Sequence, residues 1–128
     1  MIKNIVVFLA FSLLFVGCAH KQALLTQTAT ILIKTPKLKF YDKGFISKFD
    51  DYTKVEILSA GTSVLSLQIY EDRICRDTFE CQNLESFNAE FLDKNYDKQF
   101  LKELFEKEDK EIIHRDKKNK ILIKITKD

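Results

Sequence analysis

Glycine, proline and histidine are scarce in this chain. Its 128 residues include three glycines, one proline and two histidines. So few glycines exclude a glycine-rich phosphate-binding loop, a collagen-like repeat and a long flexible linker. A metal centre needs several convergent ligands, and no HxxxH, HExxH or CxxC pattern accompanies His20 or His114. We therefore expect no metal and no other cofactor, and we expect His114 to be an ordinary hydrogen-bonded or solvent-facing residue.

Catalytic patterns are also missing. The nucleophile motif GxSxG does not occur. Two pairs of adjacent carboxylates do occur, Asp50 with Asp51 and Glu108 with Asp109. Adjacent residues of a strand point to opposite faces, so neither pair forms the opposed carboxylates of a glycosidase. We predict that the protein is not an enzyme.

Neither sign of charge dominates the sequence. The chain has 21 Lys and Arg residues against 19 Asp and Glu residues, a formal net charge of +2. The signs alternate through residues 102–120, KELFEKEDKEIIHRDKKNK. A nucleic-acid-binding domain usually shows a one-sided basic face, so we expect no nucleic acid as a partner. The segment 115–120 predicts the polar tip of a hairpin, with a patch for anionic lipid headgroups as the second interpretation.

An apolar run begins close to the N-terminus. It extends from Ile5 to Val16, is interrupted only by Ser12, and follows Lys3. A helix that crosses a bilayer needs about 20 apolar residues, so this run is short for a transmembrane anchor. A signal peptide has a basic start and an apolar region of roughly 7–15 residues. We therefore predict that residues 1–17 are a signal peptide, with an uncleaved membrane anchor as the alternative.

The residues that end this run, Phe15, Val16, Gly17 and Cys18, resemble a lipobox, the signature of bacterial lipoproteins. The resemblance implies that Cys18 is acylated with a diacylglycerol, becomes the first residue after cleavage and receives a further acyl chain such as palmitate. Two or three acyl chains hold a protein stably on a membrane. The alternative is an ordinary secreted protein that is cut near Cys18.

The residue after Cys18 bears on the target membrane. In the best-known sorting rule, an Asp at this position retains a lipoprotein in the inner membrane, and here the residue is Ala19. The resemblance therefore implies the outer membrane, with the domain in the periplasm. Exposure of the domain at the cell surface is the other arrangement that an outer-membrane lipoprotein can adopt.

Two cysteines remain, Cys75 and Cys81, in the segment CRDTFEC. Disulfides persist outside the cytoplasm, so the expected compartment favours a bridge between the two. Thiol oxidoreductases place two residues between their cysteines, whereas five separate them here. We predict a structural disulfide that fixes the turn between a strand and a helix.

The rest of the chain predicts a lipidated tether at residues 18–27 and one domain at residues 28–128. Strands are indicated by β-branched residues and by alternation of apolar and polar side chains. The expected strands are residues 28–34, 37–40, 55–58, 63–70, 112–115 and 120–126. Turns are expected at Asp42–Gly44 and around Gly61.

Two short amphipathic helices are expected after the cysteines. The first presents Leu84, Phe87 and Phe91 on one face, at i, i+3 and i+7. The second covers residues 97–107, with Asp97 as its N-cap. Because the helices lie between the N-terminal strands and a C-terminal hairpin, we predict an α+β fold with a mainly antiparallel sheet.

The apolar side chains of the two helices leave two interpretations open. Phe87, Phe91, Phe100 and Leu104 either pack in a core against the sheet or line a groove for a small apolar ligand or lipid. We favour the core, and we predict an adaptor that holds an envelope protein partner at the membrane. The alternative functions are binding of an apolar ligand in the groove and inhibition of a periplasmic enzyme.

Overall fold

The computed structural model of the protein describes residues 23–128. The predicted signal peptide, Cys18 with its lipobox, and His20 lie outside the described residues. Among residues 23–128, neither helix has the length and the hydropathy that crossing a bilayer requires.

Eight strands form one antiparallel sheet in the described part of the chain. They are β1 (Leu25–Lys34), β2 (Lys39–Lys48), β3 (Tyr52–Ser59), β4 (Thr62–Tyr70), β5 (Arg73–Arg76), β6 (Glu80–Asn83), β7 (Glu111–Asp116) and β8 (Ile121–Lys127). The strand order is β6-β5-β4-β3-β2-β1-β8-β7. The first strand therefore lies inside the sheet, between β2 and β8, and the C-terminal hairpin extends the sheet on its far side.

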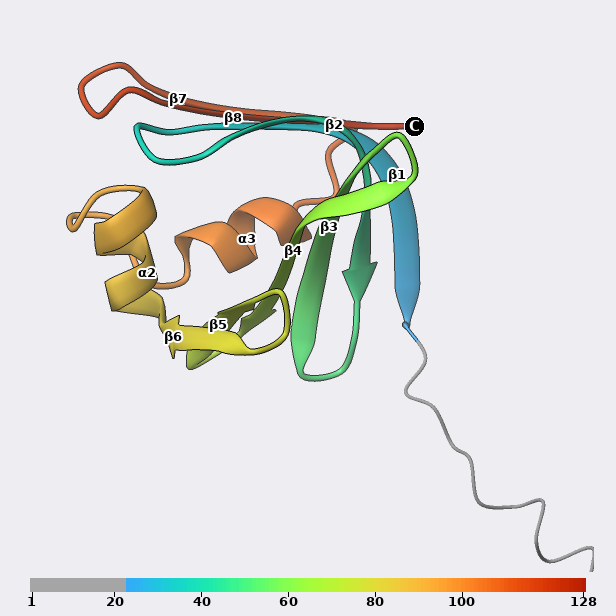
Figure 1. The fold of residues 1–128 in the computed structure, drawn as a ribbon, viewed down its shortest axis with the longest axis horizontal. Helices are drawn as coiled ribbons and strands as arrows, with labels where there is room; N and C mark the ends of the chain where they lie inside the picture. The colour runs from blue at the N-terminus through green and yellow to red at the C-terminus, as the bar shows by residue number, and fades with distance from the viewer. Residues whose placement is uncertain (1–22) are drawn as a thin grey trace, which may run out of the picture.

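The helices α2 (Leu84–Phe91) and α3 (Phe100–Glu106) lie on one face of this sheet. The sheet bends around them, so that β7 and β8 pass on one side of the helices and β5 and β6 on the other (Figure 1). The predicted antiparallel sheet and the position of both helices before the C-terminal hairpin are confirmed. Strands occupy much more of the chain than helices do, so the class is largely β.

The hydrophobic core fills the space between the concave face of the sheet and the helices. Alternation along the strands supplies one half of it: Ile121, Ile123 and Ile125 of β8 are buried, and their neighbours Leu122 and Lys124 point to the other face. The buried side chains of the helices are Leu84, Phe87, Phe91, Leu101, Leu104 and Phe105. Helices this short do not persist alone, so their packing on the sheet stabilises them.

The prediction of a turn at Asp42–Gly44 is wrong, because these residues lie inside β2. Gly44 pairs with Ala29 on one side and with Ile57 on the other. A Cβ atom at Gly44 would lie 2.1 Å from the Glu56 carbonyl oxygen. Glycine here permits a close approach between strands, and sequence alone does not distinguish this from a turn.

The turn expected at Gly61 is confirmed, with a φ of 80° at this residue between β3 and β4. The second helix starts at Phe100, three residues later than expected. Asp97 caps the preceding turn instead, because its Oδ1 accepts a hydrogen bond of 2.8 Å from the Gln99 amide. The first helix begins as expected, with Asn83 Oδ1 accepting from the Ser86 amide at 2.7 Å.

Candidate functional site

The side chains that were candidates for a groove lie in the core or against it. Phe87, Phe91 and Leu104 are only 2%, 9% and 4% exposed. Phe100 is half-buried and packs edge-on against the rings of Tyr96 and His114, each with centroids 4.7 Å away. The space between helices and sheet is therefore filled with side chains in this structure.

A polar cluster joins the α2–α3 loop to the C-terminal hairpin. The Tyr96 hydroxyl donates a 2.6 Å hydrogen bond to Asp116 Oδ2 and lies 2.8 Å from His114 Nε2. The Asn119 side chain donates to the same carboxylate at 2.8 Å. The hydrogen bond from Tyr96, with further help from Asn119, lowers the pKa of Asp116 to about 2. The cluster therefore fixes the hairpin end in place, and a satisfied, acidic carboxylate of this kind is a poor general base.

A cavity of about 590 Å³ lies between the β2–β3 turn, the β4–β5 turn and α3. Its aromatic side chains cover one another: Phe49 stacks on Tyr52 at 4.5 Å, and Tyr52 stacks on Tyr70 at 5.0 Å between centroids. The Arg73 guanidinium covers the Tyr70 ring at 3.8 Å. Because the rings pack against each other in this way, they offer little free face to a ligand.

Five charged side chains of this cavity form ion pairs with one another. Lys102 Nζ lies 3.5 Å from Glu106 and 4.0 Å from Glu71, and Arg73 pairs with Asp72 at 3.1 Å. Among residues 23–128, no group of three or more His, Cys, Asp and Glu side chains is arranged to hold a metal ion. The ion pairs and the stacked rings therefore stabilise the wall of this surface cavity.

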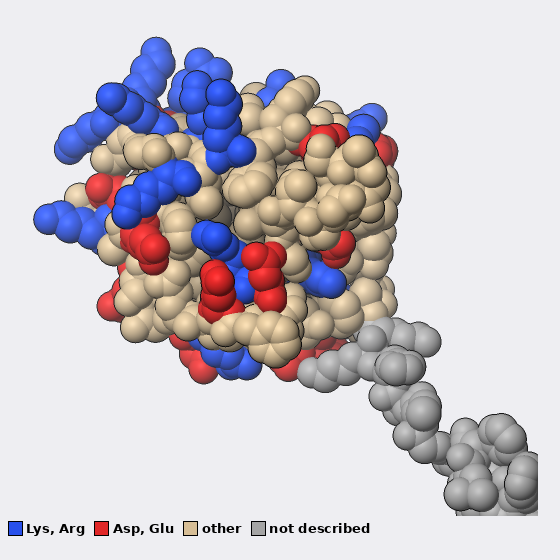
Figure 2. Space-filling model, in the orientation of Figure 1, with Lys and Arg blue, Asp and Glu red and all other residues tan. Residues whose placement is uncertain are grey.

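Two hairpin ends together form a strongly basic surface, which we call the basic end. The β1–β2 end and the β7–β8 end lie side by side because β1 pairs with β8. Figure 2 shows Lys and Arg side chains gathered at the upper left, where Figure 1 places these two ends. The basic end consists of Lys34, Lys37, Lys39, Arg115, Lys117, Lys118 and Lys120.

The pairing of β2, β1, β8 and β7 places three of the seven cations on one face of the sheet. Arg115 lies opposite Leu122, Leu122 opposite Lys34, and Lys34 opposite Lys39. Directly paired residues point to the same side of a sheet, so three cations occupy one row on the outer face. Neighbouring strands are about 4.8 Å apart, which brings these cations close enough to repel each other.

The cations of the basic end have no ion-pair partner within the described residues. Asp116 is the one carboxylate in segments 34–39 and 115–120, and its oxygens are engaged by Tyr96 and Asn119. Sequence reasoning took segment 115–120 as an isolated hairpin tip. It missed Lys34, Lys37 and Lys39 as neighbours of that tip, because only the β1–β8 pairing brings them together.

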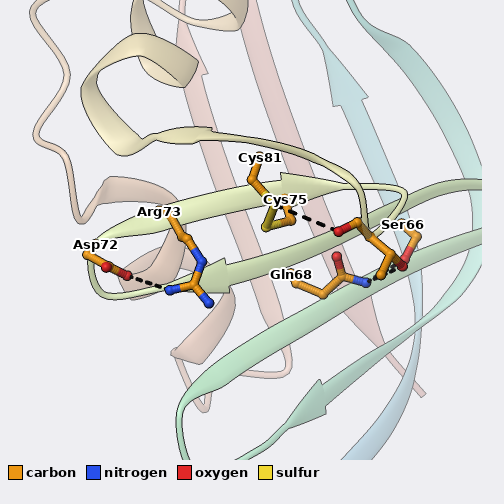
Figure 3. The surroundings of a disulfide bond; sticks show 7 residues. Ser66, Gln68, Asp72, Arg73, Cys75 and Cys81 are labelled. Carbon is orange, nitrogen blue, oxygen red and sulfur yellow. Dashed lines mark hydrogen bonds and ion pairs between the residues drawn. A yellow bond between two sulfur atoms is a disulfide. The ribbon is translucent and has the colours of Figure 1, made fainter.

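The predicted disulfide between Cys75 and Cys81 is confirmed, with an S–S distance of 2.03 Å. Its position differs from the expected one, because it joins paired residues of β5 and β6 across a hairpin and does not link a strand to a helix (Figure 3). The turn that it closes carries Phe79, whose side chain is 91% exposed. Sequence reasoning missed this residue, since an apolar side chain in a short loop gives no sign of its exposure.

No family model, curated protein or solved structure matches this chain. Within residues 23–128, we base the functional proposals below on the basic end and on the turn that carries Phe79.

Proposed function

We propose that the protein is an outer-membrane lipoprotein and a non-enzymatic adaptor, and that its basic end binds an acidic surface of an envelope protein. The observation that carries the proposal is the gathering of seven cations at the basic end, without an ion-pair partner in the described residues. The chain as a whole has a net charge of only +2. The basic end is therefore a local feature and not a consequence of a generally basic composition.

The position of the basic end supports a role in reaching outward from a membrane. The described chain enters the sheet at Leu25, and the basic end starts at Lys34, the opposite end of β1. Ten residues of strand extend about 33 Å along its path. The seven residues from Cys18 to Leu24 span at most about 25 Å. An acyl anchor on Cys18 would therefore keep the Leu25 end near the bilayer and leave the basic end free to meet a partner.

The chemistry of the basic end supports binding that is guided by charge. Clustered cations attract an acidic surface over about 10 Å at 0.1 M salt and accelerate the encounter. Six of the seven residues are lysines, whose flexible side chains adapt to a partner without a fixed geometry. The filled space between helices and sheet favours this adaptor function over the binding of an apolar ligand.

The lipid anchor is tested by metabolic labelling with a clickable fatty acid. Cys18→Ser should abolish labelling and block normal signal cleavage, because the Cys18 sulfur is the proposed acyl acceptor. Equal labelling of the variant and the natural protein would refute the lipoprotein proposal. Membrane fractionation of the same cells then reports whether the protein sediments with the outer membrane.

The adaptor function is tested by crosslinking in intact envelopes followed by affinity purification. Lys117→Glu with Lys118→Glu should remove the main protein partner from the purified material. The matched control is Lys48→Glu with Lys110→Glu, which changes the net charge equally at exposed positions outside the basic end. Loss of the partner in both variants, or in neither, would contradict the proposal.

A further inference from the structure

Phe79 is the most exposed large hydrophobic side chain of residues 23–128. It is 91% exposed, whereas Tyr41 is 70% and Ile113 is 54% exposed. An aromatic ring gains free energy by leaving water, so a protein that holds a ring almost fully in solvent forgoes that gain.

The backbone before Phe79 has an unusual conformation. Asp77 has a φ of 53° and Thr78 a φ of 77°. Positive φ is tolerated by glycine, asparagine and aspartate, so Asp77 is not unusual, but it is a genuine outlier for a β-branched residue such as Thr78. Strained backbone of this kind persists only where the surroundings impose it, and such outliers concentrate at binding and catalytic sites.

The surroundings fix this turn from two directions. The disulfide between Cys75 and Cys81 closes the base of the hairpin. On the neighbouring strand β4, the Ser66 carbonyl accepts a 2.8 Å hydrogen bond from the Asp77 amide, and Gln68 Nε2 lies 3.4 Å from the Thr78 hydroxyl. A turn whose backbone is already fixed loses little backbone entropy when a partner covers it.

The charges around Phe79 indicate what kind of surface could cover it. Asp77 and Glu80 lie close to Phe79 in the sequence, and Arg76 offsets only one of them, through an ion pair of 3.8 Å with Glu80. The turn is therefore slightly acidic, which disfavours contact with anionic lipid headgroups and favours a rim of Lys or Arg side chains. Rigid aromatic side chains that enter a pocket are the usual energetic centres of protein interfaces.

We propose that the β5–β6 turn is a preformed docking element, in which Phe79 enters an apolar pocket with a basic rim on a partner protein. This surface is separate from the basic end, so the inference stands independently of the adaptor function. The disulfide then has a functional purpose beyond stability, because it holds the turn in its binding conformation.

The proposal is tested by replacing Phe79 with the photo-crosslinking residue p-benzoylphenylalanine in the full-length protein in cells of its native host. The matched control carries the same residue at Tyr41, an exposed aromatic position on β2. Irradiation should give an adduct with one protein at position 79 and none with that protein at position 41. Peptide mapping of the adduct should place the crosslink in an apolar pocket that Lys or Arg residues border.

Two backgrounds show whether the turn itself is responsible. Cys75→Ala with Cys81→Ala should remove the adduct, because the turn is no longer fixed. Lys117→Glu with Lys118→Glu should leave it intact, which separates this inference from the proposed role of the basic end. With the identified partner in purified form, Phe79→Ala should weaken the affinity at least tenfold, whereas Phe79→Tyr should retain most of it.

Four outcomes would overturn the proposal. An adduct with phospholipid would show that the ring inserts into a bilayer. An adduct with a second copy of this chain would show self-association. The absence of any adduct, or equal adducts at positions 79 and 41, would show that the turn is not a docking element.

Discussion

Phe79 and Phe91 have the same side chain in opposite environments. Substitution by alanine should therefore lower the free energy of unfolding by very different amounts at the two positions. Phe91 is 9% exposed and packs on Phe87 with 4.7 Å between ring centroids. Phe91→Ala should lower the free energy of unfolding by about 3–5 kcal/mol, because it leaves a cavity in the core. Phe79→Ala should change it by less than about 0.5 kcal/mol. Urea unfolding of both variants measures this, and a loss near 1 kcal/mol for Phe91→Ala would indicate an open groove.

Asp116 should make stability depend on pH in the acid range. Its folded pKa of about 2 is below the ordinary value of about 3.9 for Asp, because Tyr96 and Asn119 donate hydrogen bonds to the ionised form. The contribution of Asp116 is therefore fully present above about pH 4 and is lost as the pH falls through about 2. Asp116→Asn should be less stable than the natural protein at pH 7 and equally stable near pH 2.

Urea unfolding at intervals from pH 2 to pH 7 measures this difference for Asp116. Asp109→Asn, at an exposed position, is the control and should follow the natural protein throughout. A stability gap between Asp116→Asn and the natural protein that is the same at pH 2 and pH 7 would contradict the assignment of the effect to this carboxylate.

Gly44 and Gly61 offer a second contrast at the level of single residues. Gly44→Ala would place a Cβ atom 2.1 Å from the Glu56 carbonyl oxygen, so β2 and β3 must separate. We expect a loss of about 3 kcal/mol from such overpacking. At Gly61 nothing lies within 4 Å, and the cost of alanine is the strain of its φ of 80°, about 1–2 kcal/mol. Thermal and urea unfolding of both variants should rank them in this order.

Among the elements, the β5–β6 hairpin depends most on a covalent link. Each strand has only four residues, and β6 lies at the edge of the sheet. Cys75→Ala with Cys81→Ala should lower the free energy of unfolding by about 2–3 kcal/mol, because the unfolded chain regains the entropy of the open loop. Urea unfolding measures the loss. Alkylation followed by intact-mass analysis checks the bridge, and two modified thiols in unreduced protein would refute it.

For the two helices, the predicted type of element is confirmed, but the predicted start of the second helix is wrong. Both form where apolar residues recur at helical spacing, because that spacing places them on one face. The start of α3 shifted to Phe100 because the Asp97 side chain caps a turn ahead of it. Ser, Asn and Asp cap turns and helices by similar hydrogen bonds, so a capping residue alone does not fix a helix start.

For the whole molecule, the clustering of charge should be measurable without a known partner. A protein with a net charge of +2 binds a cation-exchange resin weakly if its charges are evenly mixed. Lys117→Glu with Lys118→Glu should therefore elute at clearly lower salt than Lys48→Glu with Lys110→Glu, although both variants have equal net charge. Elution at the same salt concentration would show that the basic end does not act as one surface.

The sequence by itself determined the features that depend on neighbours along the chain. Alternation predicted the strand at 120–126, helical spacing assigned Leu84, Phe87 and Phe91 to one face, and the compartment expected from the N-terminus led to the disulfide. These predictions succeed because period and side-chain chemistry act over a few residues.

Only the tertiary structure decided which distant segments meet. The pairing of β1 with β8 joined Lys34 and Lys39 to the β7–β8 turn, and so created the basic end. The contact of Gly44 with β3 converted an apparent turn residue into a strand residue. Phe79 is exposed on a turn that a disulfide and a hydrogen bond to β4 connect to the sheet. Strand pairing and burial are settled by the packing of the whole sheet, and no local pattern encodes them.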